Sequence, residues 1–422
     1  MTASAHSNSK QHRFYPWIVW GIAAAFFFYK YVLQVFPSVM NGDLMRAFHI
    51  TGAGLGNLAA YYFYAYLIMQ IPVGILLDRY SPKFITFFAV LVCGLSCLGF
   101  AYAESLFSAS VSRFLMGLGG AFAAVSCFKL TAVWFPPKRF AMMAGLSMTA
   151  AMLGAVGGEA PLAYLVSLHG WRETIVYCAI PGFALAVLIF FAVKDKKSAH
   201  TPSPLNSGSV LLQLKTILSS KQTWLLSLYS GLAFAPVSVF GGLWGVSFLH
   251  QAYQLEPTVA ASTLSLIFIG FAIGCPVSGW FSDFIGRRRI IMVAGTLVAL
   301  FSILAVLYLP QASATLLGVL LFLFGLGASC FFLCFSMIRE INPILLAATV
   351  LGFMNTFDSL CEALIEPMIG KLLDLGWDGK MDAGARLFSL ADYHMALSVL
   401  PILFALGLLL LPLIKETYCR QS

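Results

Sequence analysis

The chain is a series of long apolar segments separated by short polar connections. About twelve segments of roughly 20 residues recur from end to end, and each could cross the ~30 Å hydrocarbon core of a bilayer as an α-helix. The expected spans are residues 15–39, 55–77, 84–103, 106–131, 140–164, 173–193, 223–249, 258–281, 290–309, 312–338, 343–370 and 393–414. The pattern predicts an all-α, multi-pass membrane protein with six spans in each half.

A polar connection separates the two halves. Residues 194–209 read K-D-K-K-S-A-H-T-P-S-P-L-N-S-G-S, and this content of Lys, Pro and Ser is typical of a flexible loop. We therefore predict an N-terminal six-helix bundle over 1–193, a linker over 194–222 and a C-terminal six-helix bundle over 223–422. An even number of spans places both termini on the same side of the membrane.

Composition supports the membrane assignment and the distribution of charge orients it. The chain is 60% hydrophobic and only 10% charged, whereas soluble domains carry about 25% charged residues. Most Lys and Arg lie in the termini, the linker and alternate connections, so the positive-inside rule places both termini in the cytoplasm. No cleavable signal peptide or N-x-[ST] sequon is present, which favours a bacterial inner membrane.

The same features exclude several other classes of protein. The net charge of +8 follows from the loop asymmetry, so it requires no nucleic-acid partner. The nine cysteines are scattered through apolar segments and are interpreted as packing residues. The histidines lack metal-ligand spacing, and no phosphate-binding G-x-x-x-x-G-K-[ST] loop occurs. We expect a monomer without a metal or cofactor, and neither an enzyme nor a receptor with a large soluble domain.

The two halves repeat a short motif. G-I-L-L-D-R-Y-S-P-K follows the second span of the first half (74–83), and G-W-F-S-D-F-I-G-R-R-R follows the second span of the other (279–289). Both contain Gly, four residues, Asp and then a basic cluster. A repeat at matching positions of two six-span halves is typical of secondary transporters.

On these residues the chain resembles the major facilitator superfamily. The first motif matches the family signature except at Ser81 and Pro82, which replace the usual Gly and basic residue, so we expect a different turn there. R-F-L-M-G-L-G-G-A (113–121) and G-A-V-G-G-E-A-P (154–161) are similar to the family motifs of spans 4 and 5. The resemblance covers essentially the whole chain and implies two pseudo-symmetric bundles that work by alternating access.

The resemblance also implies a gate. In the family, the Asp of the first motif pairs with basic residues at the cytoplasmic ends of neighbouring helices and holds the outward-open state. We expect Gly74 and Gly279 to let helices approach closely. The alternative is a solvated basic turn without a gating role. The expected gating residues are Gly74, Asp78, Arg79, Lys83, Gly279, Asp283, Arg287 and Arg288.

Ionisable residues inside the spans are the candidate functional groups, because each is costly in a membrane and faces protein or water. Lys30 lies near the middle of the first span, on the same helix face as Gln34. Helix 1 lines the central cavity in the family, so we predict that Lys30 binds a carboxylate or another anion. The alternative is a structural ion pair. Tyr62 and Tyr66 share a face of span 2 and either line the cavity or only pack.

Two further charges lie in the outer halves of spans 4 and 5. Arg113 shares a face with Gly117 and Gly120, and in the family this Arg position is often coupled to substrate or proton; a structural pair is the alternative. Glu159 lies beside the glycines of span 5. It either pairs with Arg113 or carries a proton, and the sequence does not separate the two hypotheses.

Three acids fall on one face of span 11. Asp358, Glu362 and Glu366 are spaced i, i+4 and i+8, with Asn355 on the same side. Three acids on one buried face cannot all stay ionised cheaply, so we expect at least one to be protonated near neutral pH. Asp358 and Glu362 are predicted to bind solute or proton, while Glu366 is predicted to lie nearer water. A structural stripe that pairs with bases such as Lys30 is the alternative.

These features predict a secondary transporter of a small organic solute. Lys30 in one half and Asp358 or Glu362 in the other offer opposite charges across a cavity, which suits a zwitterion such as an amino acid or short peptide. The buried acids favour proton coupling. If they serve protons only, a small organic anion fits better.

Overall fold

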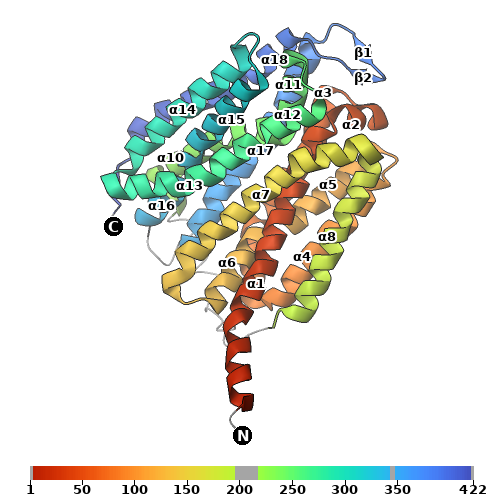
Figure 1. Cartoon of the computed structure of the whole chain (residues 1–422). Coiled ribbons are helices and arrows are strands. Elements are labelled where there is room, and N and C mark those ends of the chain that lie inside the picture. The colour runs from red at the N-terminus through yellow and green to blue at the C-terminus, as the bar shows by residue number, and fades with distance from the viewer. Residues whose placement is uncertain (1–2, 195–216, 343–346, 420–422) are drawn as a thin grey trace.

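The computed structural model describes residues 3–194, 217–342 and 347–419. It is almost entirely helical, and the two halves of the chain form two adjacent bundles (Figure 1). The predicted linker, 194–222, lies largely outside the described residues. In Figure 1 the chain ends lie away from the β1–β2 hairpin, so we call the two ends of the molecule the terminal end and the hairpin end.

The N-terminal half follows the predicted spans closely. A break in the first span at Phe36–Val39 and the short helix α2 after it are the main additions. The elements are α1 (Ala3–Val35), η1 (Phe36–Val39), α2 (Asn41–Phe48), α3 (Gly52–Arg79), α4 (Pro82–Ala101), α5 (Leu106–Gly120), α6 (Phe122–Trp134), α7 (Pro137–His169) and α8 (Trp171–Ala192).

The C-terminal half repeats the six spans with more interruptions. A π-helical turn, Phe240–Trp244, interrupts the seventh span, and a two-stranded hairpin precedes the last. The elements are α10 (Lys221–Val239), η3 (Phe240–Trp244), α11 (Gly245–Tyr253), α12 (Pro257–Leu264), α13 (Leu266–Ile285), α14 (Arg288–Tyr308), α15 (Ala314–Ala328), η4 (Ser329–Phe332), α16 (Leu333–Glu340), α17 (Ala347–Gly376), β1 (Met381–Asp382), β2 (Ala385–Arg386), α18 (Leu390–Leu397), α19 (Val399–Leu410) and η6 (Leu411–Leu413).

Local sequence explains where the helices begin and end. Thr51 caps α3 by accepting the Gly54 N–H at 3.2 Å, as hydroxyl side chains do at helix starts. Ser81 caps α4 and Pro82 occupies its first turn, where a missing N–H costs nothing. The second motif instead turns at Gly286, whose φ of +71° suits glycine. The predicted difference between the two turns is confirmed.

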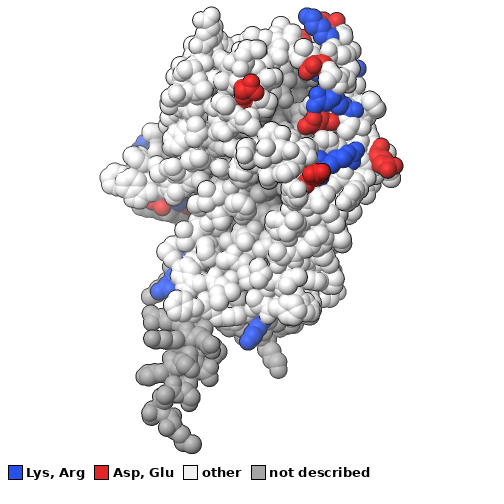
Figure 2. Space-filling model, turned by 45° about the vertical axis from the view of Figure 1, so that its right-hand side comes forward, with Lys and Arg blue, Asp and Glu red and all other residues white. Residues whose placement is uncertain are grey.

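The surface of the bundle is suited to lipid. Ten segments of the described chain are long and apolar enough to span a membrane. The remaining long helices, α3 and α17 with 28 and 30 residues, complete a set of twelve, so the predicted all-α membrane fold is confirmed. Figure 2 shows charged side chains gathered mainly over the hairpin end, above a nearly uncharged middle. Such a band fits the hydrocarbon region of a bilayer.

Helices of opposite halves pack together along the centre of the molecule. Toward the hairpin end, α3 and α17 lie so close that a Cβ on Gly370 would come 2.1 Å from the Gly52 carbonyl oxygen. Within the N-terminal half, a Cβ on Gly154 of α7 would lie 2.1 Å from the Phe28 carbonyl oxygen of α1. Small residues make these close approaches possible, and they bring α1, α3 and α17 around one central space.

Candidate functional site

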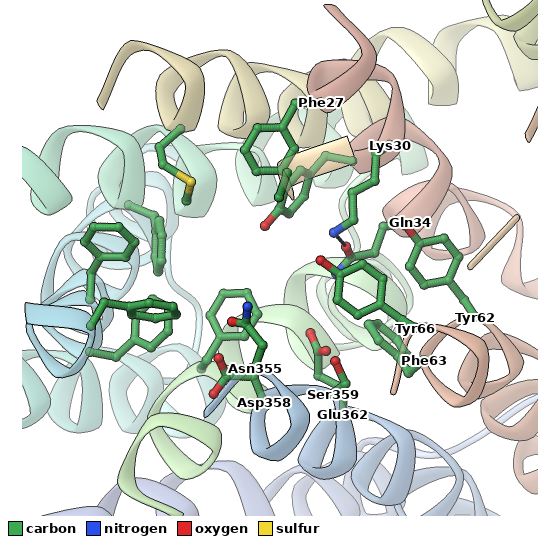
Figure 3. Close-up of a pocket in the computed structure, with 18 of the residues that line it drawn as sticks. Phe27, Lys30, Gln34, Tyr62, Phe63, Tyr66, Asn355, Asp358, Ser359 and Glu362 are labelled. Carbon is green, nitrogen blue, oxygen red and sulfur yellow. Dashed lines mark hydrogen bonds between the residues drawn. The ribbon is translucent and has the colours of Figure 1, made fainter. Parts of the chain in front are cut away.

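A cavity of about 150 Å³ lies between the two halves of the molecule. Side chains from α1 and α3 form one wall, and side chains from α17 form the opposite wall (Figure 3). All seven residues predicted to bind solute line it. They are Lys30, Gln34, Tyr62, Tyr66, Asn355, Asp358 and Glu362.

Lys30 is buried in the α1 wall, and its ammonium points toward the cavity (Figure 3). It donates a hydrogen bond to Gln34 Oε1, the partner that helical spacing predicts. The ammonium also lies 3.8 Å from the ring centre of Tyr31 and 4.9 Å from that of Tyr66, distances at which aromatic rings attract a cation. These contacts hold the Lys30 charge beside the cavity without neutralising it.

Glycines on α5 make room for this wall. A Cβ on Gly120 would lie 2.5 Å from Tyr62 Oη and 3.3 Å from Lys30 Cγ. A Cβ on Gly117 would lie 2.1 Å from the Tyr62 carbonyl oxygen. The two glycines on one face of α5 therefore leave the room that the Tyr62 ring and the Lys30 stem occupy.

The α17 wall carries the acids. Asp358 and Glu362 are both buried and both project from α17 into the cavity beside Asn355 (Figure 3). Asp358 accepts a hydrogen bond of 2.6 Å from Ser230 Oγ of α10. Glu362 lies beside Ser238 of α10, and its Oε1 has no hydrogen-bond partner among the described residues. Each carboxylate thus contacts a serine hydroxyl of α10, and Glu362 also keeps one free oxygen.

Opposite charges therefore face each other across the cavity without direct contact. Glu362 is near enough to Lys30 to attract it electrostatically, yet no described acid forms an ion pair with Lys30. Gln34 extends the α1 wall to α10, because its amide lies 3.3 Å from Ser238 Oγ. The structural ion pair that was the alternative for Lys30 is not formed.

Arg113 serves a different purpose from Lys30. Pro37 has no N–H to offer the Leu33 carbonyl four residues earlier, and Arg113 donates to that oxygen instead. It also donates to the Gln34 carbonyl at 2.7 Å and lies 4.7 Å from the Phe36 ring centre. Arg113 therefore braces the break between α1 and η1, behind the cavity wall. Its predicted part in proton coupling remains a prediction.

The structure removes one alternative for Glu159 and shows that one prediction, for Glu366, was wrong. Glu159 does not pair with Arg113: it is fully buried and accepts a 2.6 Å hydrogen bond from Ser38 of η1. Glu366 does not lie near water, because only 2% of its surface is exposed. It packs where α17 meets α3, near enough to Arg113 to attract it. The third acid of the stripe is thus separated from the cavity by packing that the sequence pattern does not reveal.

Toward the hairpin end, polar bonds join the two halves. Asp374 of α17 accepts the Gly52 and Ala53 N–H groups at 2.8 and 2.7 Å, which places a carboxylate at the positive end of α3. Arg386 of β2 pairs with the same carboxylate at 2.9 Å. Asn41 of α2 donates to the Leu243 carbonyl of η3 at 2.7 Å. The Arg386–Asp374 pair lies within the C-terminal half and holds the carboxylate in place. We call the bonds between the halves, from Asp374 to α3 and from Asn41 to η3, the outer seal.

At the terminal end, the second copy of the motif forms bonds inside its own half. Arg288 pairs with Asp283 and with Glu340 of α16, both at 2.8 Å. The Glu416 carboxylate accepts the Arg288 and Arg289 N–H groups at 2.8 and 2.9 Å, which caps α14. Arg287 precedes α14 in an extended conformation. This copy therefore joins helix ends of one bundle.

The first copy is less fully described. The side chains of Asp78 and Arg79 lie outside the described residues, so the predicted latch remains a prediction. Lys83 places its ammonium 5.1 Å from the Phe190 ring centre. The prediction that Gly74 and Gly279 allow close approach was wrong for this conformation. A Cβ at either position would meet nothing within 4 Å.

Sequence reasoning missed several residues of the site. Ser230 and Ser238 are spaced eight residues apart on α10, which places them on one helix face, and that spacing was the available signal. The apolar part of the cavity lining was missed too, although F-F-L-C-F (331–335) shows dense aromatic content. Asp374 offered no signal of contact between the halves, because its partners there are backbone N–H groups more than 300 residues earlier.

Comparison with known proteins identifies the family. The sequence model of the Major Facilitator Superfamily matches residues 19–365. The chain is 23% identical to the probable L-galactonate transporter of Escherichia coli (strain K12), over 80% of this chain and 78% of that one. It is 22% identical to the lysosomal dipeptide transporter MFSD1 of Danio rerio, over 80% and 76% of the two chains.

Solved structures show the same fold. A crystal structure of a bacterial homologue of the human lysosomal transporter Spinster superposes with a TM-score of 0.77 at 15% identity, over 97% of this chain and 99% of that one. The chain belongs to the Major Facilitator Superfamily. It is a membrane transporter of small organic solutes and not an enzyme.

Proposed function

Starting from that membership, we propose that the protein moves a small zwitterion, an amino acid or short peptide, across the membrane together with protons. One observation carries the proposal: Lys30 and the Asp358–Glu362 pair line one cavity from opposite halves and form no ion pair with each other. A buried charge without a partner is unfavourable. A solute with one positive and one negative group would give a partner of opposite charge to Lys30 on one wall and to the acids on the other.

Each charged group receives a distinct role. Lys30 binds the solute carboxylate, since among the described residues its ammonium is held by Gln34 and aromatic rings and by no acid in an ion pair. Glu362 binds the solute ammonium, because it is the acid that attracts Lys30 electrostatically and because it keeps a free oxygen. Asp358 carries the proton, because Ser230 holds it in place when it is ionised, and a buried acid beside a second acid gains a proton easily.

The two ends of the molecule support alternating access. The outer seal closes the hairpin end by bonds between the halves, whereas the Asp283–Arg288–Glu340 bonds of the terminal end lie within one half. We propose that this is the state open toward the cytoplasm. In the opposite state the hairpin end opens and the outer seal breaks. The terminal end then closes, and Asp78, Arg79 and Lys83 approach the C-terminal bundle and form the latch.

The remaining proposals follow from sequence. Both termini lie in the cytoplasm of a bacterial inner membrane, as the distribution of Lys and Arg indicates. Residues 194–222 connect two bundles that move as bodies, and one chain suffices because the cavity is built from its two halves. Besides its solute and protons, the protein requires only the lipid bilayer.

A small organic anion is the second candidate. The Escherichia coli relative is named as a probable transporter of L-galactonate, an organic anion, and Lys30 offers a cation to such a solute. In that case Asp358 and Glu362 would both serve protons, and no solute ammonium would contact Glu362. The two candidates therefore differ in whether the solute must carry a positive charge.

Proteoliposomes with a trapped pH-sensitive dye test the proposal. A mixture of amino acids added outside, without a starting pH gradient, should acidify the lumen, and the Lys30→Ala protein should show no response. If sugar acids acidify the lumen and amino acids do not, the zwitterion proposal is wrong and the protein transports organic anions. Solute uptake without any proton movement would overturn the coupling.

A further inference from the structure

The cavity has a third side that the charged residues do not use. Five phenylalanines of the C-terminal half line it, and they come from four helical elements: Phe234, Phe271, Phe331, Phe332 and Phe335. In Figure 3, aromatic rings gather on the side of the cavity away from Tyr62 and Tyr66. Met148 of α7 adds a flexible apolar side chain. No charged residue lines this side, which we call the aromatic side.

The rings form a continuous surface. Phe234 stacks on Phe331 with ring centres 4.8 Å apart and planes 20° apart. Phe332 stacks on Phe335 at 5.0 Å and 25°, and Phe271 lies 5.6 Å from Phe331. Stacked rings bury much apolar area and offer no hydrogen bonds to a ligand. A group that binds here must be apolar.

The volume limits the size of that group. The cavity measures about 150 Å³, and an apolar cavity of roughly 150 Å³ accommodates one benzene-sized group. This volume includes the space beside the charged walls, so the cavity holds one small solute with a single side chain. Two side chains, as in a dipeptide, exceed it.

We propose that the solute is a single α-amino acid with an apolar side chain, such as leucine or phenylalanine. Lys30 and Glu362 bind its carboxylate and ammonium, while the aromatic side holds its side chain. Sugar acids are rejected, because each hydroxyl placed against the rings would lose its hydrogen bonds with water and gain none. This inference rests on the proposed zwitterion transport and narrows it to one solute class.

Competition against a radiolabelled amino acid on the purified protein tests the inference. Glycine, alanine, serine, valine, leucine, phenylalanine and leucyl-leucine are compared. A buried methylene changes affinity about fourfold, so leucine should bind at least tenfold more tightly than alanine or serine. Leucyl-leucine should compete poorly. Equal binding of serine and leucine would overturn the aromatic side as a specificity determinant, and so would preferred binding of the dipeptide.

Variants locate the preference on the rings. Phe331→Leu and Phe331→Ala enlarge the aromatic side in two steps, so the ratio of leucine to alanine affinity should fall with each. Phe301→Ala, at a ring that is 65% exposed on α14, is the matched control and should leave the ratio unchanged. The smaller step guards against misfolding of the Ala variant. An unchanged ratio in a folded Phe331→Leu protein would overturn the inference.

The outcomes also separate this inference from the proposed function. If amino acids bind and require Lys30 but show no preference for apolar side chains, only the aromatic side is refuted. If sugar acids bind and no amino acid does, the zwitterion proposal fails together with it.

Discussion

The central cavity and the packed region beside it contain the same kinds of charged residue in opposite situations. In the cavity, Lys30 faces Glu362 and Asp358 and no ion pair joins them to Lys30. In the packed region, which we call the seam (Ser38, Arg113, Glu159 and Glu366), Arg113 is bound to backbone carbonyls and Glu159 to Ser38. The comparison teaches that burial of a charge alone does not identify a binding residue.

The two cations differ in whether the protein backbone needs them as hydrogen-bond donors. Arg113 compensates for a hydrogen bond that Pro37 cannot make, so its planar fork is used by the protein itself. Lys30 replaces nothing, because the helix around it is regular. Its charge remains available to a ligand, which is why we expect cavity substitutions to affect function and seam substitutions to affect stability.

The largest expected effect is at Lys30. Removing one partner of a buried charge pair costs ~2–5 kcal/mol, so Lys30→Ala should weaken binding of an apolar amino acid about 100-fold in calorimetric titration. Lys415→Ala, at an exposed position in the C-terminal segment, is the control and should bind normally. Wild-type affinity in Lys30→Ala would erase the distinction between cavity and seam.

Asp358 should separate binding from coupling. Asp358→Asn keeps the shape and a hydrogen bond to Ser230 but cannot release a proton, so uptake driven by a pH gradient should fall at least ~10-fold. Exchange of labelled for unlabelled solute should change less than ~3-fold. In the wild-type protein, lowering the external pH loads the carrier and raises uptake, and in Asp358→Asn this dependence should vanish. If the pH dependence is retained in Asp358→Asn, the residue that carries the proton must be a different one.

Arg113 should behave in the opposite way to Lys30. Arg113→Met leaves the Leu33 and Gln34 carbonyls without their donor, and each buried unsatisfied group costs ~1–3 kcal/mol. We expect a clearly lower melting temperature in detergent with solute affinity within ~3-fold of the wild type. Normal stability combined with lost proton coupling would show that the seam is functional after all.

The smallest expected effect is at the outer seal. Asp374→Asn weakens the cross-half bonds to Gly52 and Ala53 by ~1–2 kcal/mol, which corresponds to a roughly 5–30-fold shift between conformations. Ser247 lines a pocket at the hairpin end. A cysteine introduced at this position should then react faster with a membrane-impermeant maleimide. Unchanged labelling, relative to Ser247→Cys alone, would remove Asp374 from the seal.

Much of this architecture could be predicted from the sequence, because periodic hydrophobicity and repeated motifs are local signals. The twelve spans and the shared face of Asp358 and Glu362 required only helix geometry, while the cavity position of Lys30 followed from the resemblance to the family. The sequence could not separate Glu366 from its two neighbours, since that depends on α3 packing against α17. It also could not show that Arg113 serves the Leu33 carbonyl, a contact between residues 80 positions apart.

Pairing changes in the solute with changes in the protein tests the central claim most directly. Leucinamide lacks the carboxylate charge and 4-methylpentanoate lacks the ammonium, so calorimetric affinities of leucine and both analogues form cycles with Lys30→Ala and Glu362→Gln. We predict that Lys30→Ala weakens leucine about 100-fold but barely changes leucinamide, while Glu362→Gln weakens leucine but barely changes 4-methylpentanoate. Equal losses for all three ligands in both variants would contradict a site in which Lys30 and Glu362 bind opposite ends of one zwitterion.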